Sequence, residues 1–249
     1  MINLISNPTN LWNNPDPVSI TVVGTGGTGS QLLVQLGKIH AALRGLGRPG
    51  LTVIAYDNDT VTEANIGRQQ FSPSDIGKAK VTVLIQRINR FYGTQWMAIP
   101  EMYEEKGSCS ANLIIGCVDN IKSRKTIYSN LKRESLFGDV NMDRIEYFID
   151  TGNDRDFGQV VFWNNYPHSG KKKMRSVFDI FGTPEEKPNT PSCSMQEALA
   201  KQHILINTAI ATYAGTLVWD ILTKKELDNQ GIIFNLKSMK TKLIPIKWK

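Results

Sequence analysis

Cysteine and histidine are scarce in this chain of 249 residues, which contains three of each. The cysteines are Cys109, Cys117 and Cys193, and no two of them are spaced as a CxxC pair. An odd number of cysteines cannot form a fully paired disulfide framework, and a four-thiolate zinc site needs more sulfur ligands than are present. We therefore expect a protein of a reducing compartment, the cytoplasm, and we expect no zinc.

Signals for targeting and membrane insertion are lacking as well. The first 37 residues contain no Lys or Arg and no continuous apolar stretch, whereas a secretory signal needs a basic start and an apolar core. The longest uncharged candidate for a membrane span, residues 204–219, is shorter than the roughly 20 apolar residues that a bilayer requires. We expect no membrane association and interpret this segment as part of a buried core helix.

The excess of basic over acidic residues, a net charge of +6, comes from two segments. One segment carries Lys171, Lys172, Lys173 and Arg175, and the other carries Lys237, Lys240, Lys242, Lys247 and Lys249. Nucleic-acid-binding proteins usually spread such residues over one face, with aromatic or helical readers between them. A basic loop and tail are more typical of solvated segments, so we do not expect nucleic acid as the main partner.

Short apolar strands alternate with amphipathic helices along the rest of the chain. The patterns predict strands at 19–23, 51–56, 96–100, 113–118, 145–150 and 159–163, helices at 32–43, 81–91, 121–135 and 195–225, and a final β-hairpin. In the second helix we expect one buried face made of Val81, Leu84, Ile85, Ile88 and Phe91. The alternation predicts an α/β fold with a Rossmann-like, doubly wound, mostly parallel sheet, helices on both faces and a C-terminal antiparallel extension.

Residues 1–249 are interpreted as a single domain, because neither a linker nor an internal repeat divides them. Residues 1–17, rich in Asn and Pro, are expected to form an irregular N-terminal arm. Residues 164–192 are polar, basic and interrupted by proline, and are expected to form a long crossover loop. Loops of this length in compact domains are often functional or mobile.

A glycine-rich turn follows the first predicted strand and precedes the first predicted helix. Its spacing, Gly24-x-Gly26-x-x-Gly29, is typical of a phosphate-binding loop, because glycine lets the backbone approach the phosphates and the helix supplies free N–H groups. Asp57 ends the next strand and suits a ribose hydroxyl, although capping the following turn is the alternative. Considered alone, these residues leave open a NAD or FAD site or a structural glycine turn.

Further motifs make the resemblance specific. After the glycine turn come D-x-D-x-V from Asp57, N-x-x-R-Q from Asn65, D-x-G-x-x-K from Asp75, and Asp119-Asn120 with Arg124. This order resembles the ThiF/MoeB adenylyltransferases, the superfamily that includes ubiquitin-activating enzymes. The match is close over residues 18–125 and continues more weakly through Gly158-Gln159 and Pro191-Ser192-Cys193. The short form without zinc ligands resembles the plasmid-borne PRTRC-system branch of ThiF-type proteins.

The resemblance implies ATP-dependent adenylylation of the C-terminal carboxylate of a ubiquitin-like or sulfur-carrier protein, expected to end in glycine, with release of pyrophosphate. It assigns the phosphate-binding loop to Gly24, Gly26, Gly27 and Gly29, the ribose to Asp57, the phosphates to Asn65, Arg68 and Lys80, magnesium to Asp119, and further nucleotide contacts to Asp59, Gln69 and Asn120. Of these, Arg68, Lys80 and Asp119 are expected to be catalytic. A terminal carboxylate has a pKa of about 3.5 and is already ionised, so the attack needs no general base.

Cys193 falls where some relatives carry a cysteine for thioester or persulfide chemistry, and a structural thiol is the alternative. Cys117 is expected to be buried in a strand, and Cys109 to lie in a loop. The resemblance also implies a homodimer. Members such as MoeB supply an N-terminal arginine to the partner's nucleotide, whereas this chain has no arginine before Arg44.

Two other functions stay open at this point. A NAD-dependent oxidoreductase would explain the glycines and Asp57, but would leave Arg68, Lys80 and Asp119 without a function. A nucleotide-binding scaffold that docks a ubiquitin-like partner with reduced catalysis would explain the missing N-terminal arginine.

Overall fold

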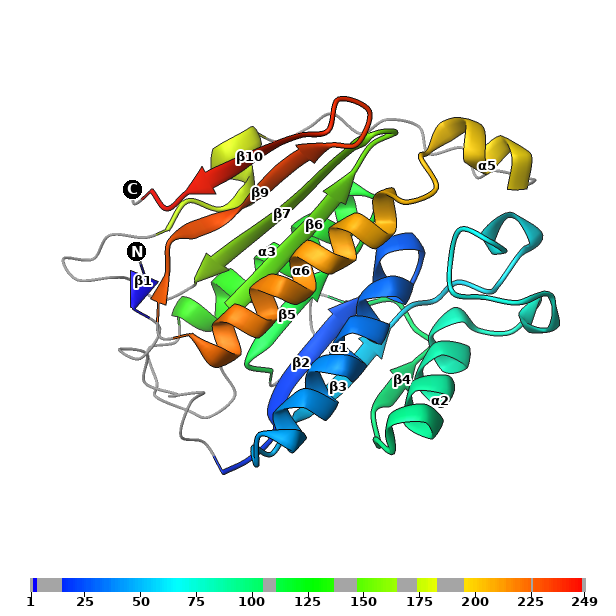
Figure 1. Ribbon diagram of the computed structural model, residues 1–249, viewed down its shortest axis with the longest axis horizontal. Coiled ribbons are helices and arrows are strands. Elements are labelled where there is room, and N and C mark those ends of the chain that lie inside the picture. The colour runs from blue at the N-terminus through cyan, green and yellow to red at the C-terminus, as the bar shows by residue number, and fades with distance from the viewer. Residues whose placement is uncertain are drawn as a thin grey trace.

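A mixed sheet of eight strands forms the centre of the computed structural model, which describes residues 2–3, 15–104, 111–136, 147–164, 174–182, 195–224 and 226–247. Its parallel part contains β2 (Val18–Val23), β3 (Leu51–Tyr56), β4 (Met97–Ile99), β5 (Leu113–Gly116) and β6 (Tyr147–Asn153). Antiparallel pairing adds β7 (Phe157–Asn164), β9 (Asn229–Asn235) and β10 (Lys240–Pro245). The strand order is β10-β9-β7-β6-β5-β2-β3-β4 (Figure 1).

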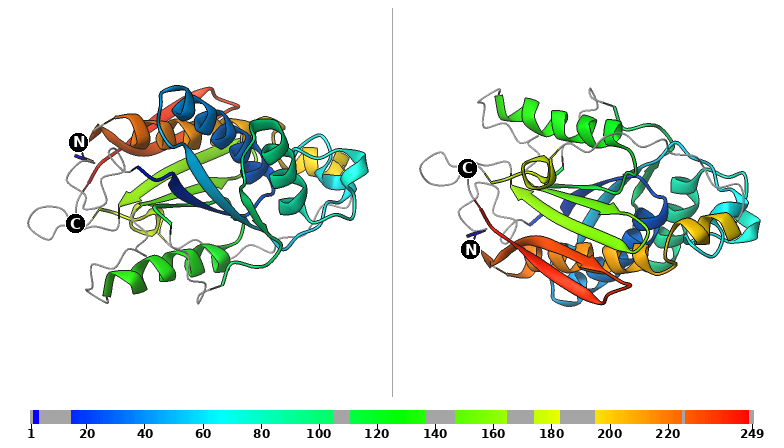
Figure 2. Two further views of the ribbon diagram at one scale, coloured as in Figure 1. Left: turned by 90° about the horizontal axis from the view of Figure 1, so that it is seen from below. Right: turned by 90° about the horizontal axis from the view of Figure 1, so that it is seen from above.

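Helices cover both faces of this sheet (Figure 2). One face carries α1 (Gly27–Gly45), α2 (Lys80–Tyr92) and α6 (Ile206–Thr223), and the other carries α3 (Ile121–Leu136) and α4 (Val177–Phe181). The remaining elements are β1 (Ile2–Asn3), which pairs with β8 (Glu226–Leu227), the 3₁₀ helices η1 (Glu63–Asn65) and η2 (Pro73–Asp75), and α5 (Met195–Lys201). The Rossmann-like α/β fold with an antiparallel C-terminal extension is therefore confirmed.

The core forms where central strands have apolar side chains on both faces. Val22 of β2 and Ile115 of β5 are fully buried between the helix layers, as expected for parallel strands that are covered on both sides. On one of these faces α1 packs against α6, with Leu36 and Ile210 both buried. This packing fixes the N-terminal end of α1 relative to the strand ends, which is where the site lies.

The expected helix over residues 195–225 is wrong as a single element. The chain forms α5 and α6 instead, separated at residues 202–205, although this segment contains neither Gly nor Pro. At the break the backbone N–H of His203 donates to the carbonyl of Arg155, 2.9 Å away, and the Gln202 side chain accepts from Arg68. Tertiary hydrogen bonds therefore decide where the helix ends.

Phe91 is also misplaced in the sequence prediction, because it is 80% exposed in the last turn of α2. Tyr92 packs against the core instead, next to Gly37 of α1. The other expected face residues, Val81, Leu84, Ile85 and Ile88, are buried.

Parts of the predicted arm and loop fall outside the described residues. Of the arm, residues 2–3 form β1 rather than an irregular segment, and residues 4–14 are not described. Of the loop, residues 174–182 include α4, whereas 165–173 and 183–194 are not described. None of the helices within the described ranges is long and apolar enough to cross a membrane.

Candidate active site

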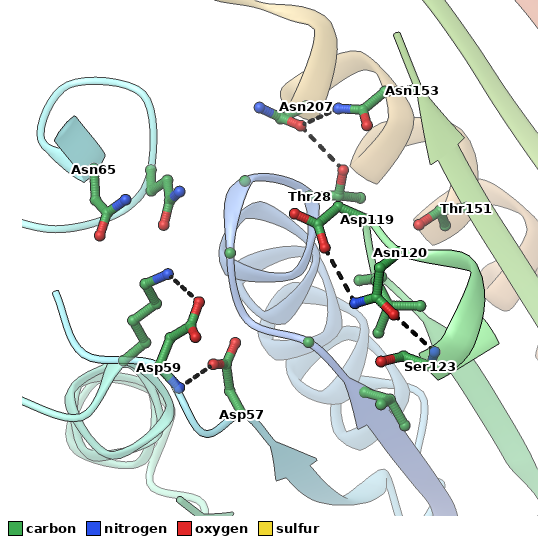
Figure 3. A pocket seen from close by; sticks show the side chains of 18 of the residues that line it. Thr28, Asp57, Asp59, Asn65, Asp119, Asn120, Ser123, Thr151, Asn153 and Asn207 are labelled. Atoms are coloured by element: carbon green, nitrogen blue, oxygen red, sulfur yellow. Dashed lines mark hydrogen bonds and ion pairs between the residues drawn. The ribbon is translucent and has the colours of Figure 1, made fainter. Parts of the chain in front are cut away.

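A cavity of about 750 Å³ opens at the carboxyl ends of β2, β3, β5 and β6 (Figure 3). The turn after β2, the segments after β3 and β5, the end of β6 and the break between α5 and α6 line it. Ligands of doubly wound sheets bind at this edge, because the loops after the parallel strands converge there.

The glycine turn forms one wall and leads directly into α1. Gly24 has a φ of +91° and donates its N–H to the carbonyl of Tyr56, 2.8 Å away. A Cβ on Gly26, the residue before α1, would meet no atom within 4 Å. The backbone at Gly26 is thus uncovered on the cavity side. The first N–H groups of a helix have no partner within the helix and attract anions.

Asp57 joins the glycine turn to the end of β3. Its Oδ2 accepts from the N–H of Thr25 at 2.5 Å and from the Thr25 hydroxyl at 2.9 Å. Its Oδ1 accepts from the N–H of Asp59 at 2.8 Å. Asp57 therefore organises both turns and also lines the cavity, where a carboxylate can accept a further bond from a hydroxyl.

Lys80, the first residue of α2, lines the same cavity and forms an ion pair with Asp59. Its ammonium lies 2.8 Å from the Asp59 carboxylate, and its side chain is only 8% exposed whereas that of Asp59 is 62% exposed. The ion pair fixes the direction of the Lys80 side chain. Because Asp59 faces solvent, the pair contributes position rather than much stability.

The segment around η1 supplies a second cation. Arg68 donates from Nη1 to Oε1 of Gln202 at 2.7 Å, while its Nε and the Oε1 of neighbouring Gln69 are buried without a hydrogen-bond partner among the described residues. Burial lowers the pKa of Arg68, and the negative charge of Asp119 opposes this effect. Asn65 accepts from the Thr62 N–H at 2.9 Å, which stabilises the turn that carries Arg68.

Asp119 and Asn120 follow β5 and have different functions in the fold. Oδ1 of Asn120 accepts from the N–H of Ser123 at 2.8 Å, so Asn120 caps α3. Its amide nitrogen lies 3.4 Å from Oδ1 of Asp119. Asn120 caps α3, and the exposed carboxylate of Asp119 beside it lines the cavity (Figure 3).

Behind this wall, a buried ion pair ties α3 to β6. Nε of Arg124 lies 3.1 Å from Oδ1 of Asp150, and Nη2 donates to the Thr151 carbonyl at 3.0 Å. Burial raises the pKa of Asp150 to about 6, against the opposing effect of Arg124. Neither residue lines the cavity. Arg124, which belongs to the sequence motif, therefore contacts the end of β6 and does not face the cavity.

Cys117 is not the buried strand residue that the sequence predicted. It lies one residue beyond β5, is partly exposed and lines the cavity. Its thiol is free, and burial of the sulfur raises its pKa to about 12. The thiol is therefore neutral at physiological pH. Cys109 and Cys193 lie outside the described residues.

Most of the predicted site residues are brought together in this cavity. Its lining includes Gly24, Gly26, Gly27, Asp57, Asp59, Asn65, Arg68, Gln69, Lys80, Asp119 and Asn120. Gly29 lies behind the lining, against Gly24. The roles assigned to these residues stay predictions, since their position alone does not show what they bind.

The sequence analysis missed the wall that comes from the second half of the chain. Asn153, Arg155, Lys201, Gln202 and Asn207 all line the cavity. Asn207 is 1% exposed, and its Oδ1 accepts from the Thr28 hydroxyl at 3.1 Å and from Asn153 Nδ2 at 2.9 Å. An amide within the apolar segment 204–219 was a usable signal, because buried amides require partners.

The available oxygen ligands suit Mg²⁺ bound together with phosphates. No group of three or more His, Cys, Asp or Glu side chains that could hold a metal occurs in the described ranges. Mg²⁺ commonly takes one or two carboxylates along with substrate phosphates and water. The exposed carboxylate of Asp119 at the cavity therefore fits such an ion.

Comparison with known proteins places this architecture. A family model described as "ThiF family" matches residues 16–248. The ubiquitin-like modifier-activating enzyme 5 of Culex quinquefasciatus is 28% identical over 135 residues, which cover 47% of this chain and 32% of that protein. The chain thus corresponds to about a third of that relative's length.

Two solved structures have a similar fold. PaaA superposes with a TM-score of 0.63 at 18% identity, covering 93% of this chain and 64% of that chain. E. coli MccB, crystallised with MccA, gives a TM-score of 0.61 at 16% identity, covering 98% of this chain and 68% of that chain. At these identities the likeness shows the fold.

Proposed function

This chain belongs to the ThiF family, and we propose that it catalyses the ATP-dependent adenylylation of a C-terminal carboxylate. The proposed substrate is a ubiquitin-like or sulfur-carrier protein that ends in glycine, and pyrophosphate is released. One observation carries the proposal. Arg68, Lys80 and Asp119 line the same cavity as the uncovered backbone of Gly26, which leads into α1.

The reaction joins two anions, and the charges in the cavity suit it. A carboxylate oxygen of the carrier attacks the α-phosphorus of ATP, the bond from that phosphorus to the pyrophosphate oxygen breaks, and an acyl-adenylate forms. Carboxylates are ionised at neutral pH, so the cavity needs no base. Its task is to offset the repulsion between the two anions and the charge on the leaving pyrophosphate.

Each proposed residue has a distinct part in this task. The N–H groups at the start of α1 would bind phosphate oxygens, and Asp57 would accept from the ribose. Lys80, directed by Asp59 at 2.8 Å, and Arg68 would contact the phosphates. Asp119 would hold Mg²⁺, which when bound neutralises phosphate charge.

The comparisons support this choice of substrate class. A ubiquitin-like modifier-activating enzyme is among the relatives, and solved MccB structures contain ATP or MccA. A protein or peptide tail is therefore the proposed acceptor of the adenylyl group.

A dinucleotide oxidoreductase accounts for fewer of the observed residues. It uses the glycine turn and Asp57, but it gives no function to Arg68 and Lys80, the two cations described above that line the cavity. Calorimetric titration with ATP and Mg²⁺, and separately with NAD, distinguishes these functions. Tighter binding of NAD than of ATP would overturn our proposal.

The decisive test is ATP–pyrophosphate exchange with small glycine-ending proteins encoded beside this gene. We expect exchange that depends on both ATP and one such carrier. Binding of ATP without exchange for any carrier would favour the catalytically reduced scaffold. A homodimer and a cytoplasmic location stay predictions, and light scattering of the purified protein tests the first of them.

A further inference from the structure

We propose that Gln202 is a positioning residue that holds Arg68 at the cavity, and that Asn207 holds Gln202 in turn. This inference rests on the proposed function, because it treats Arg68 as a ligand of the ATP phosphates. It concerns the break between α5 and α6, which contains no recognised nucleotide-binding motif.

Arg68 needs an external support, because it lies in a connecting segment rather than in a helix or strand. Its Nη1 donates to Oε1 of Gln202 at 2.7 Å, across 134 residues of sequence. A long side chain without such a partner samples many rotamers and loses that freedom when it binds a ligand. The bond to Gln202 restricts the guanidinium before the nucleotide arrives.

The donor and acceptor groups of these side chains fix the orientation of each amide in the network. A guanidinium can only donate, so Gln202 must present its oxygen to Arg68. The same oxygen accepts from Nδ2 of Asn207 at 3.1 Å. Asn207 therefore turns its own oxygen the other way, where it accepts from the Thr28 hydroxyl at 3.1 Å and from Asn153 Nδ2 at 2.9 Å.

Burial and close packing hold the Asn207 side chain in place. It is 1% exposed in the first turn of α6, and a Cβ on Gly27 would lie 2.6 Å from its Nδ2. Asn207 is thus packed directly against the start of α1 (Figure 3). The network therefore connects Arg68 to the same helix end that would bind the phosphates, and both are oriented in advance, as electrostatic stabilisation of a transition state requires.

The break between α5 and α6 is what makes this connection possible. Gln202 directly follows α5, and His203 donates its N–H to the Arg155 carbonyl at 2.9 Å. This bond draws the break toward the β6–β7 turn. Nε of Arg68 is buried without a hydrogen-bond partner among the described residues, so the bond from Nη1 to Gln202 is the contact that orients the guanidinium.

Calorimetric titration of the full chain with ATP and excess Mg²⁺ tests this role without any carrier. Gln202→Met keeps the length of the side chain but removes the acceptor, and we expect it to weaken ATP binding about five- to tenfold. Arg68→Met should weaken binding at least as much. In the Arg68→Met background, Gln202→Met should have no further effect, because its partner is gone.

Thr212→Val is the matched control. Thr212 is exposed on α6 and donates one hydrogen bond to the Thr208 carbonyl at 2.9 Å, away from the cavity. We expect this variant to bind ATP as the unmodified protein does. Should Gln202→Met destabilise the fold in thermal unfolding, Gln202→Asn keeps an amide at this partly exposed position and withdraws it by one methylene group.

The outcomes separate this inference from the proposed function. If the unmodified protein does not bind ATP, both are overturned. If Arg68→Met weakens binding but neither Gln202 variant does, the positioning role is wrong and the proposed function is unaffected. Additive losses in the double variant would likewise contradict the coupling, whereas non-additive losses support it.

Discussion

Gly29 packs so tightly against Gly24 that a Cβ on Gly29 would lie 2.0 Å from the Gly24 carbonyl oxygen. The third glycine of the motif is therefore required by contact within the loop itself. By contrast, a Cβ on Gly26 would meet no atom within 4 Å. Packing within the loop therefore explains the glycine at position 29, but it does not explain the glycine at position 26.

Gly29→Ala should destabilise the protein by about 1–3 kcal/mol, because backbone atoms would have to move to admit the methyl group. Gly26→Ala should leave the free energy of unfolding nearly unchanged and weaken ATP binding, because its methyl group occupies the space beside the expected phosphates. Urea unfolding and calorimetric titration measure the two effects. If Gly29→Ala were as stable as Gly26→Ala, the close contact between Gly29 and Gly24 would be contradicted.

Asp119→Ala should abolish carrier-dependent ATP–pyrophosphate exchange while leaving stability within about 0.5 kcal/mol, because Asp119 is exposed and Asn120 caps α3. Asp228→Ala is the control, since Asp228 is an exposed carboxylate that does not line the cavity. Exchange at the unmodified rate in Asp119→Ala would exclude Asp119 as the magnesium ligand.

Asp150 should make stability depend on pH in a defined window. Burial raises its pKa from 3.8 to about 6, so the folded state binds this proton more tightly than the unfolded chain. The resulting stability is fully present below pH 3.8 and is lost as the pH rises through about 6.

Asp150→Asn removes this titration. We therefore expect the stability of the unmodified protein, relative to the variant, to fall by about 2 kcal/mol between pH 4 and pH 7. Urea unfolding of both proteins across this range gives the difference. Parallel curves for Asp150→Asn and the unmodified protein would contradict the raised pKa.

Cys193→Ala separates activation from transfer, because adenylylation needs only the nucleotide site. If the thiolate attacks the acyl carbon of the adenylate, AMP leaves and a thioester forms, which appears as a thiol-sensitive adduct on non-reducing gels. We expect the variant to retain exchange and, where the unmodified protein forms the adduct, to lose it. No adduct in the unmodified protein under robust exchange would mean that the enzyme stops at the adenylate.

The sequence by itself determined the sheet, most helices and the half of the cavity that comes from residues 18–125. These features depend on local information, namely the alternation of apolar segments and short polar motifs at strand ends. Since parallel strands place their carboxyl ends at one edge, the motifs converge once the fold class is known. Gly24, Asp57 and Asp119 could therefore be assigned to one site before any coordinates.

Only the tertiary structure decided the half of the cavity that comes from the rest of the chain. The break between α5 and α6 has no Gly or Pro to mark it and exists because Gln202 and His203 bond to Arg68 and Arg155. The separate functions of Asp119 and Asn120, and the placement of Arg124 on the strand ends, likewise depend on partners distant in sequence. Contacts of this kind are set by packing between layers, which local patterns do not encode.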